Sequence, residues 1–412
     1  MATVRFTGNA QAVAQIETLT VGGTIEAGDL FIMTINGKSL VVVAPDTDAS
    51  DTAAAIANAW CACTIAEFRE AAAVATDATI ALTAKTAGNP FLVSVGTVEA
   101  DGTPADDQTF TQATTVPSAG PNDWSQPANW SNGSTPVSGD DVYLDQSDID
   151  VLYGLDQHSV SLNSLQIAAN FSGQVGLPDA NELYVEYRDR TLRIGAANVV
   201  IGAGPGSGSQ RLRLDTGDGA TTVSVVNTGT PLDNDSPALL WIGSNAANVL
   251  DVSRGSVGVA LAPGETAQVS AQVGSHSMNS DGDADVRFGP GVTFGGLKQN
   301  GGRVEINSDI ELIEKTNGEL TVSAGAITTL KNFGGTLFYN SSSALGIATI
   351  GGRGRLDFSQ DLSPKTVGLC NLAAGAVLYD PLGVASPAFR TVDCALSDVR
   401  VTVGFDKTYT PS

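Results

Sequence analysis

Pairs of apolar residues with one residue between them recur five times between residues 283 and 358, every 16 to 19 residues. The pairs are Val286/Phe288, Val304/Ile306, Leu320/Val322, Leu337/Tyr339 and Leu356/Phe358. A second apolar series lies between them and consists of Leu297, Ile313, Leu330 and Ile350. Two short alternating segments per period, separated by Gly, Asn and Ser, are typical of a strand, a corner, a second strand and a second corner. The sequence therefore predicts a mainly β protein built on a β-solenoid.

Stacking explains why such a repeat folds. One coil cannot bury its apolar pair alone, whereas coils laid on one another form a continuous interior stripe and a ladder of hydrogen bonds. The spacing along the stack is then about 4.7–4.9 Å, as between neighbouring strands. The glycine pairs at 301–302, 334–335 and 351–352 fall where corners need a positive φ or close backbone approach. We expect the solenoid to span 151–379 and residues 380–412 to form a C-terminal cap or a subunit contact.

Residues 1–100 have a different pattern, which predicts a small α+β domain for assembly or anchoring. Two apolar runs, 30–35 and 39–43, flank Asn36-Gly37, a strong signal for a hairpin. An Asp- and Ala-rich segment predicts a helix near 50–61, and a second helical piece is expected at 65–72. The runs 78–84 and 91–95 predict a further hairpin.

This order of elements, followed by Thr-Ala-Lys-Thr-Ala-Gly-Asn-Pro-Phe at 83–91, resembles small domains of tailed-bacteriophage virion proteins, especially tail and appendage components. The resemblance covers Gly23 to Glu99. It implies a non-enzymatic module that mediates assembly contacts.

Residues 101–120 are rich in Asp, Thr, Gln and Pro and are predicted to be a linker. The following segment, 121–150, contains Asp-Trp, Asn-Trp, Pro and Gly-Asp and resembles the segment that precedes the first coil in many bacterial and phage β-solenoids. We expect it to cap the open end of the solenoid and to protect its edge strands. The capping residues are Trp124, Trp130, Pro136 and Asp140. The alternative is that the two tryptophans are exposed and stack on sugar rings.

Composition excludes several classes of function. The formal net charge is −23, from 21 basic and 44 acidic residues, which argues against binding to nucleic acid or to an anionic membrane surface. No apolar run approaches the length of a membrane span. Four cysteines are too few and too scattered for a disulfide framework or a zinc knuckle. A histidine-based site would have to use His158 or His276, since there are no others.

Two clusters are candidate sites. Asp281, Asp283 and Asp285 begin like a calcium loop, but Val286 and Val292 stand where an EF-hand has Gly and Glu, so the alternative is a solvated loop. The polar and aromatic cluster comprises Tyr184, Glu186, Arg188, Asp189 and Arg190. Its two carboxylates, Glu186 and Asp189, are compatible with the acid and base of a glycosidase. Nothing else in the sequence, however, supplies the repeated carboxylates of a substrate groove. We therefore expect ion pairs in a contact between subunits, no catalytic residue, and no cofactor other than the candidate calcium.

These observations predict a structural protein on the surface of a bacteriophage virion. It is expected to decorate and cement the capsid or to form a head or tail fibre or spike, bound to major capsid or tail proteins. Decoration is favoured because aromatic residues make up only 6% of the chain, which is sparse for a receptor or glycan reader. A homo-oligomer, for example a trimer, is expected. The alternative is a bacterial surface adhesin or a β-helical protein that binds or depolymerises polysaccharide.

Overall fold

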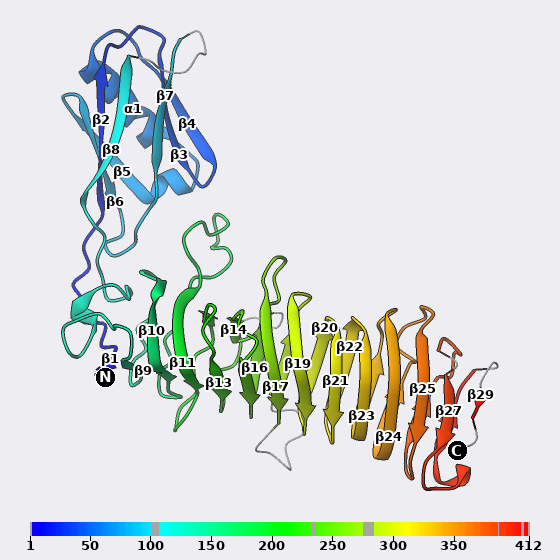
Figure 1. The fold of residues 1–412 in the computed structure, drawn as a ribbon. Coiled ribbons are helices and arrows are strands. Elements are labelled where there is room, and N and C mark those ends of the chain that lie inside the picture. The colour runs from blue at the N-terminus through cyan, green and yellow to red at the C-terminus, as the bar shows by residue number, and fades with distance from the viewer. Residues whose placement is uncertain are drawn as a thin grey trace.

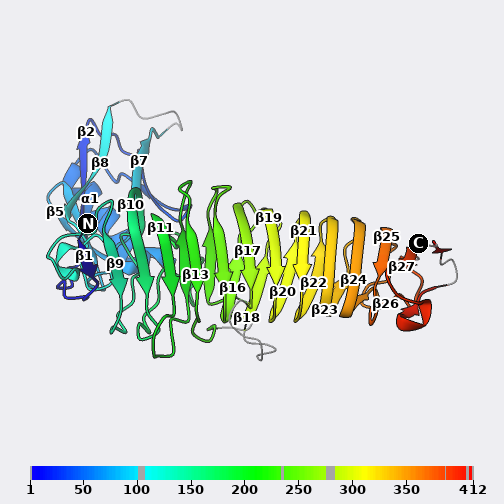
Figure 2. The same ribbon diagram turned by 60° about the horizontal axis from the view of Figure 1, so that its bottom comes forward.

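A computed structural model describes residues 2–100, 107–232, 236–274, 284–385, 387–404 and 408–410. The described chain is mainly β, with one α-helix, and has two parts (Figure 1). A compact N-terminal domain lies at one end of a long body of parallel strands, and the C-terminal strands lie at the far end (Figures 1 and 2). The predicted mainly β fold is therefore confirmed.

The N-terminal domain contains two small antiparallel sheets with strand orders β5-β6-β2-β8 and β4-β3-β7. The predicted hairpin around Asn36-Gly37 is confirmed, since both residues have the positive φ that a tight turn needs, 52° and 70°. The elements are β2 (Ile16–Gly23), β3 (Leu30–Ile35), β4 (Lys38–Val43), α1 (Ala49–Ala62), a 3₁₀ turn (Glu67–Glu70), β5 (Ala71–Thr76), β6 (Thr79–Ala84), β7 (Ser94–Val98) and β8 (Gln108–Val116).

Helix α1 confirms the helix predicted near 50–61. The side chain of Asp48 caps it by accepting hydrogen bonds from the backbone N–H groups of Ser50 and Asp51. The second helical piece is shorter than expected and is only the 3₁₀ turn. The hairpin predicted from 78–84 and 91–95 is wrong, because β6 pairs with β5 and β2 whereas β7 pairs with β3 in the other sheet.

The boundaries of the N-terminal domain differ from those predicted. Strand β1 (Thr3–Arg5) pairs in parallel with β9 (Asp141–Leu144), so one strand of the long sheet precedes the small domain in sequence. The predicted linker at 101–120 contains β8, which pairs with β2. Beyond its first residues, β8 is largely exposed, as expected of a polar edge strand. The domain is thus an insertion between β1 and β9.

The long body is one large sheet in which almost every strand pairs in parallel with the strand two places further along the chain. Two ladders therefore alternate in sequence and run the length of the body. The remaining strands are β10 (Asp156–Ile167), β11 (Leu192–Ile201), β12 (Leu212–Asp215), β13 (Thr222–Val225), β14 (Leu239–Ile242), β15 (Val249–Val252), β16 (Gly255–Val259), β17 (Ala267–Val273), β18 (Ala284–Phe288), β19 (Val292–Gln299), β20 (Arg303–Asn307), β21 (Ile310–Lys315), β22 (Glu319–Ala324), β23 (Ile327–Tyr339), β24 (Ala344–Asp357), β25 (Thr366–Leu372), β26 (Val377–Tyr379), β27 (Ala388–Thr391), β28 (Arg400–Thr402) and β29 (Thr408–Tyr409).

Strand register confirms that the recurring apolar pairs stack on one another. Val286 aligns with Val304, which aligns with Leu320, and the series continues through Leu337 to Leu356. These five side chains are fully buried in one apolar core that extends along the body. The second series is confirmed as far as Leu330, but its next neighbour is Ala348 rather than Ile350. Residues 380–412 include β27 to β29, which extend both ladders instead of forming a separate cap.

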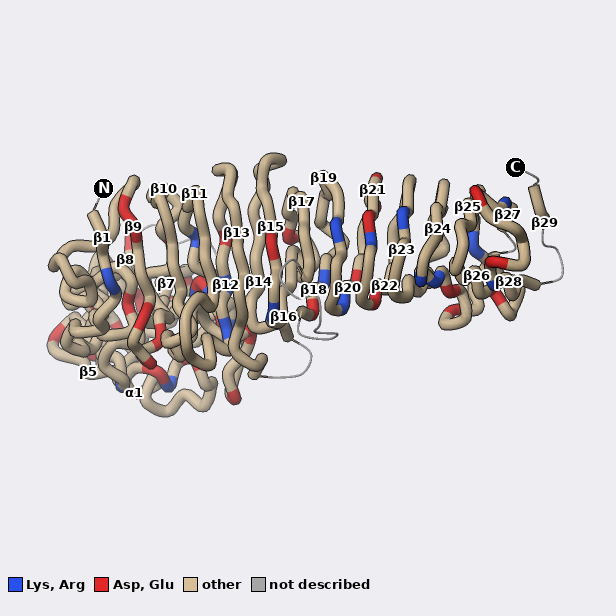
Figure 3. The backbone as a smooth tube through the Cα atoms, turned by 90° about the horizontal axis from the view of Figure 1, so that it is seen from below, with Lys and Arg blue, Asp and Glu red and all other residues tan. Residues whose placement is uncertain are grey.

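Charged residues of both signs are interspersed along the long body (Figure 3). Glu314 on β21 is within 4.0 Å of Lys298 on β19 and within 3.0 Å of Lys331 on β23. Both lysines are more than two-fifths exposed, so each pair contributes little to stability. Alternating charge does reduce repulsion between stacked strands, where like charges would face each other.

One interior corner of the long body is polar. Gln299, Lys315 and Asn332 are neighbours in register and are fully buried. The Lys315 ammonium donates to the carbonyl oxygens of Asn317 (2.8 Å), Gly318 and Gly334 (2.9 Å). Gly335 beside it has a φ of 71°, and a Cβ there would lie 2.4 Å from Lys315 Nζ. The predicted glycine corner at 334–335 is thus explained by this close approach.

The Lys315 pKa is set mainly by burial, which lowers it to about 7, while the charge of Glu319 acts in the opposite direction. In the unfolded chain the pKa of a lysine is about 10.4. Between these values the unfolded chain holds a proton that the folded chain has released, so stability rises with pH across this window. Below about pH 7 both states are protonated and the contribution of this residue is constant.

We predict that Lys315→Met removes this rise in stability. The variant is expected to be less stable because buried carbonyl groups that accept from Lys315 lose their donor, at about 1–3 kcal/mol for each unsatisfied group. Urea unfolding at intervals between pH 7 and pH 10 measures the slope. Lys331→Met, on the exposed face of β23, is the control and should keep the wild-type slope. Equal slopes in all three proteins would contradict the prediction.

Candidate functional site

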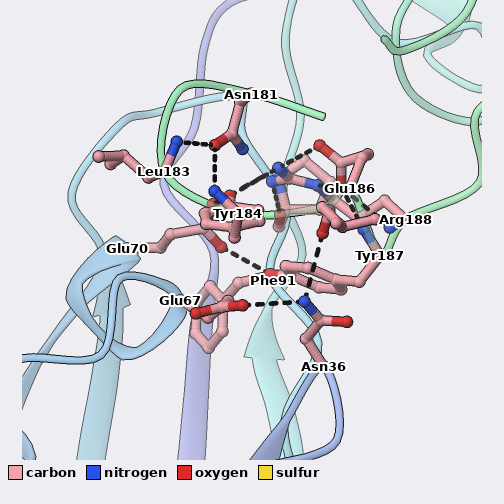
Figure 4. Close-up of polar contacts among 12 residues, drawn as sticks. Asn36, Glu67, Glu70, Phe91, Asn181, Leu183, Tyr184, Glu186, Tyr187 and Arg188 are labelled. Atoms are coloured by element: carbon pink, nitrogen blue, oxygen red, sulfur yellow. Dashed lines mark hydrogen bonds and ion pairs between the residues drawn. The ribbon is translucent and has the colours of Figure 1, made fainter. Parts of the chain in front are cut away.

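The loop between β10 and β11 reaches from the long sheet to the N-terminal domain (Figure 4). Its residues 184–188 contact the 3₁₀ turn at Glu67–Glu70, the β3–β4 turn and the segment before β7. Asn36 Nδ2 donates to the carbonyl oxygen of Val185 at 3.2 Å and to Glu67 Oε1 at 2.8 Å. We call the contact formed by Glu70, Tyr184, Glu186, Tyr187 and Arg188 the interdomain clamp.

Arg188 is the centre of the interdomain clamp. Its guanidinium donates from Nε and Nη2 to the two carboxylate oxygens of Glu186, at 2.8 and 2.9 Å, which is the bidentate geometry of a strong ion pair. It also donates from Nη1 to the carbonyl oxygen of Pro90 in the N-terminal domain, at 2.9 Å. The Arg188 side chain is 10% exposed and that of Glu186 is 2% exposed, so water screens the pair weakly.

Glu70 supplies the carboxylate from the N-terminal side. Its Oε2 accepts a hydrogen bond of 2.6 Å from the Tyr187 hydroxyl, and its Oε1 accepts one from Tyr184. Arg188 Nη2 lies 3.4 Å from the same carboxylate. Burial, followed by the hydrogen bond to Glu70, raises the pKa of both tyrosines, so both hydroxyls remain donors at neutral pH.

The pKa of Glu186 is set by its burial and by its hydrogen-bond partners. Burial alone would raise its pKa, but hydrogen bonds from the Arg188 side chain and backbone outweigh burial and lower the pKa overall. A carboxyl group whose pKa is lower in the folded state stabilises the fold above its unfolded pKa, and that stabilisation is lost as the pH falls through the folded pKa. The interdomain clamp should therefore loosen in acid.

The structure shows what this cluster contacts within the chain. Tyr184 and Arg188 bond to residues of the N-terminal domain, and Glu186 holds Arg188 in place. The expected contact between subunits stays a prediction. Asp189 is exposed and lines a hollow together with Leu92 and Arg188. Arg190 pairs with Asp179 and does not reach the N-terminal domain contact. The glycosidase reading of Glu186 and Asp189 has little geometric basis, because the Glu186 carboxylate is buried and bonded on both oxygens.

Sequence analysis missed the residues that the N-terminal domain contributes. Tyr184 and Tyr187 bond to Glu70 across separations of 114 and 117 residues, and no local pattern marks such a pairing. Glu67 was also missed. Its buried side chain is held by Lys38 at 2.7 Å and by Asn36. Burial opposes this arrangement, but the two hydrogen bonds lower the Glu67 pKa overall.

The predicted capping residues lie where the two parts of the chain meet, next to β1. Trp124 and Trp130 are buried, with ring centroids 4.6 Å apart in an edge-to-face arrangement, and Phe6 packs on Trp130 at 5.4 Å. The Trp130 indole N–H donates to the backbone carbonyl of Trp124 at 2.8 Å. Burial of both rings argues against the alternative of a platform for sugars.

Pro136 and Asp140 complete this segment. Pro136 is buried, and the Asp140 carboxylate accepts hydrogen bonds from the backbone N–H groups of Ala2 (3.0 Å) and Val137 (3.1 Å). Asp140 therefore ties the N-terminal strand to the segment before β9. This position is consistent with the predicted role of these residues as a cap.

The candidate calcium loop lies mostly outside the described residues, which include neither Asp281 nor Asp283. Asp285 is described and lies on β18, with its carboxylate 3.5 Å from Arg287. Within the described part of the chain, no three His, Cys, Asp or Glu side chains are grouped as a metal site would require.

Comparison of the chain with known protein families, with curated proteins and with solved structures found no match. Among the described residues, no helix is both long enough and apolar enough to cross a membrane. The candidate site is therefore interpreted from its geometry, which is that of a buried polar contact between two domains.

We predict that Arg188→Met opens the interdomain clamp. The substitution leaves Glu186 buried without its partner, a change that typically costs about 3–5 kcal/mol. The domains should separate before either unfolds, which small-angle scattering would detect as a larger maximum dimension and thermal unfolding as an earlier first transition. Arg69→Met is the control, because Arg69 is exposed beside Glu70. A scattering profile equal to that of the wild type would contradict the prediction.

We also predict that Trp130→Ala destabilises the junction by about 3–5 kcal/mol, the usual cost of truncating a buried aromatic side chain to alanine. Trp130→Phe keeps most of the ring and should lose less, since only the indole hydrogen bond and part of the buried surface are removed. Chemical denaturation followed by fluorescence measures both. If Trp130→Ala lowered the free energy of unfolding by less than about 1 kcal/mol, the prediction would be wrong, because a loss that small is usual at surface positions.

Proposed function

We propose that this protein is a non-enzymatic structural component of a tailed-bacteriophage virion, exposed on the particle surface. The observation that carries the proposal is the pair of parallel ladders, which run from β9 to β29 with a small domain held at one end. We infer that the ladders form a β-solenoid, with each pair of strands as one coil. A long stiff body with an attachment module at one end is suited to project from an assembly.

The N-terminal domain is proposed as the module that attaches to the particle. Support comes from the resemblance of residues 23–99 to assembly domains of phage tail and appendage proteins. The interdomain clamp adds a mechanical reason, since a projecting body transmits force to its anchor only if the junction is rigid. The partner is then a major capsid or tail protein.

Capsid decoration is favoured over a fibre or spike. Cementing depends on burying surface across several neighbouring subunits, and affinity is multiplied when a symmetric oligomer grips several sites. A homo-oligomer, for example a trimer, would supply that multiplicity. The low aromatic content also fits a surface that is not specialised for binding glycans.

The alternative is a bacterial adhesin or a polysaccharide depolymerase. It would require a carboxylate groove on the outside of the long body. Figure 3 instead has acidic and basic residues interspersed, and Glu186 is occupied in the interdomain clamp. These observations favour the structural proposal.

Quantitative mass spectrometry of purified virions of the phage whose genome encodes the chain tests the proposal. A decoration protein should be present in many copies per particle, and a fibre or spike in a few. Absence from virions would refute the proposal. Cleavage of a host polysaccharide by the wild-type protein, lost in Glu186→Ala while scattering shows the domains still docked, would establish the alternative.

A further inference from the structure

A hollow of about 230 Å³ lies where the N-terminal domain meets the long body. One wall is the segment between β6 and β7, at Pro90 and Leu92, and belongs to the N-terminal domain. The other walls are residues 152–156, which lead into β10, and the β10–β11 loop at Arg188 and Asp189. The hollow adjoins the interdomain clamp through Arg188. It is therefore complete only while the two parts of the chain are docked.

Hydrogen bonds hold the walls of the hollow in place. The side-chain amide of Gln15 donates to the carbonyl oxygen of Phe91 and accepts from its backbone N–H, both at 2.9 Å, which fixes the wall in the N-terminal domain. The backbone N–H of Leu152 donates to the Asn122 carbonyl oxygen at 2.8 Å. The interdomain clamp fixes the loop. A ligand would thus enter a site whose shape exists before binding, which keeps the entropic cost of binding small.

Part of the hollow is apolar. Leu92 is 59% exposed although it is a large apolar residue, and Pro90 and Leu152 are half-buried. Leu155 lies beneath them in the sense that it is 2% exposed and belongs to the core. The exposed carbon atoms would gain from contact with methylene groups, because such contact removes apolar surface from water. The apolar wall therefore fits a ligand that carries an aliphatic stem.

Tyr153 brings a polar group without a partner to the hollow. It is only 8% exposed, yet its hydroxyl makes no hydrogen bond to any described residue. The hydroxyl is not fully enclosed, so a molecule in the hollow can reach it. Burial raises the pKa of Tyr153, so the hydroxyl stays neutral and is able to donate or to accept. A largely buried polar group without a partner costs free energy that a suitable ligand would recover.

The charges around the hollow favour a cation. Asp189 is exposed, and its carboxylate has no hydrogen bond or ion pair to another described residue. Asp156 is partly compensated, since it bonds to His158 at 2.8 Å and is paired in register with Arg193. Arg188 is the one cationic side chain among the described residues that line the hollow, and its charge is already met in the interdomain clamp. The Asp189 carboxylate is therefore left for a ligand.

We propose that this hollow binds an alkylammonium group, held by the Asp189 carboxylate and the Tyr153 hydroxyl, with its aliphatic stem against Leu92 and Leu152. An ammonium has three donors and no acceptor, which suits a carboxylate and a phenolic oxygen. The net charge of −23 also attracts cations to the protein. The group is supplied by a small free amine or by a lysine side chain of another protein. Binding favours the docked arrangement, because both parts of the chain form the hollow.

Ligand-observed NMR titration of the full chain tests the proposal with n-butylamine, 1-butanol and butyrate, which share a short aliphatic stem and differ in charge. Butylamine should bind with a Kd on the order of 1 mM, weakening as salt is added, and the other two should bind at least about tenfold more weakly. Nα-acetyl-lysine methylamide distinguishes the two sources, since it matches butylamine only if the hollow admits a side chain attached to a backbone. The result does not depend on the virion proposal, because binding is measured on the isolated protein.

Two variants locate the site. Tyr153→Phe removes only the hydroxyl without a partner, so it should keep the thermal stability of the wild type while weakening butylamine binding about tenfold. Asp189→Asn should weaken binding at least as much, whereas Asp218→Asn, which changes an exposed aspartate between β12 and β13, should leave it unchanged. The proposal is overturned if butylamine does not bind, if butanol binds as tightly, or if both Tyr153→Phe and Asp189→Asn retain wild-type affinity.

Discussion

The alignment of apolar side chains along the two parallel ladders is the constraint on which the rest of the structure depends. Val304 is buried only because Val286 and Leu320 lie directly beside it on neighbouring strands. Each such contact is short in space yet links residues more than a dozen positions apart. Stability is thus distributed over many similar interfaces between nearest neighbours, and the loss of one weakens its surroundings without removing the basis of the fold.

Buried polar residues are accommodated where this repetition is interrupted. The carbonyl groups near Lys315 turn inward at the glycine corners, and Gln299, Lys315 and Asn332 satisfy them in successive layers. At the N-terminal end of the body, Arg188 and Glu186 are paired almost out of contact with water. In both places the polar group fixes a geometry that apolar packing alone leaves open, and the cost of burying it is offset by several hydrogen bonds.

The sequence predicts those parts of the fold that repeat or are local. The apolar pairs, the Asn36-Gly37 turn and helix α1 are recognisable because their patterns lie within a few residues or recur at a regular interval. The pairing of β1 with β9 and of Tyr187 with Glu70 is not recognisable, because each joins distant segments with no shared pattern. Strand β8 was missed since it is polar and lies at the edge of a sheet, where composition resembles that of a linker. The cluster at 184–190 was recognisable as a candidate contact from its dense polar and aromatic residues, but its bonds to Glu70 and Pro90 within the same chain were not.

The insertion of the small domain between β1 and β9 has a mechanical consequence. Two stretches of backbone cross the junction, and they are bonded to each other where Val13 N donates to the Ala119 carbonyl oxygen at 2.8 Å. A pull on the domain is therefore divided between two connections that are anchored in adjacent strands. Twisting is resisted as well, since rotation about one connection is blocked by the other. A domain joined at only one end of its chain would swivel under the same load.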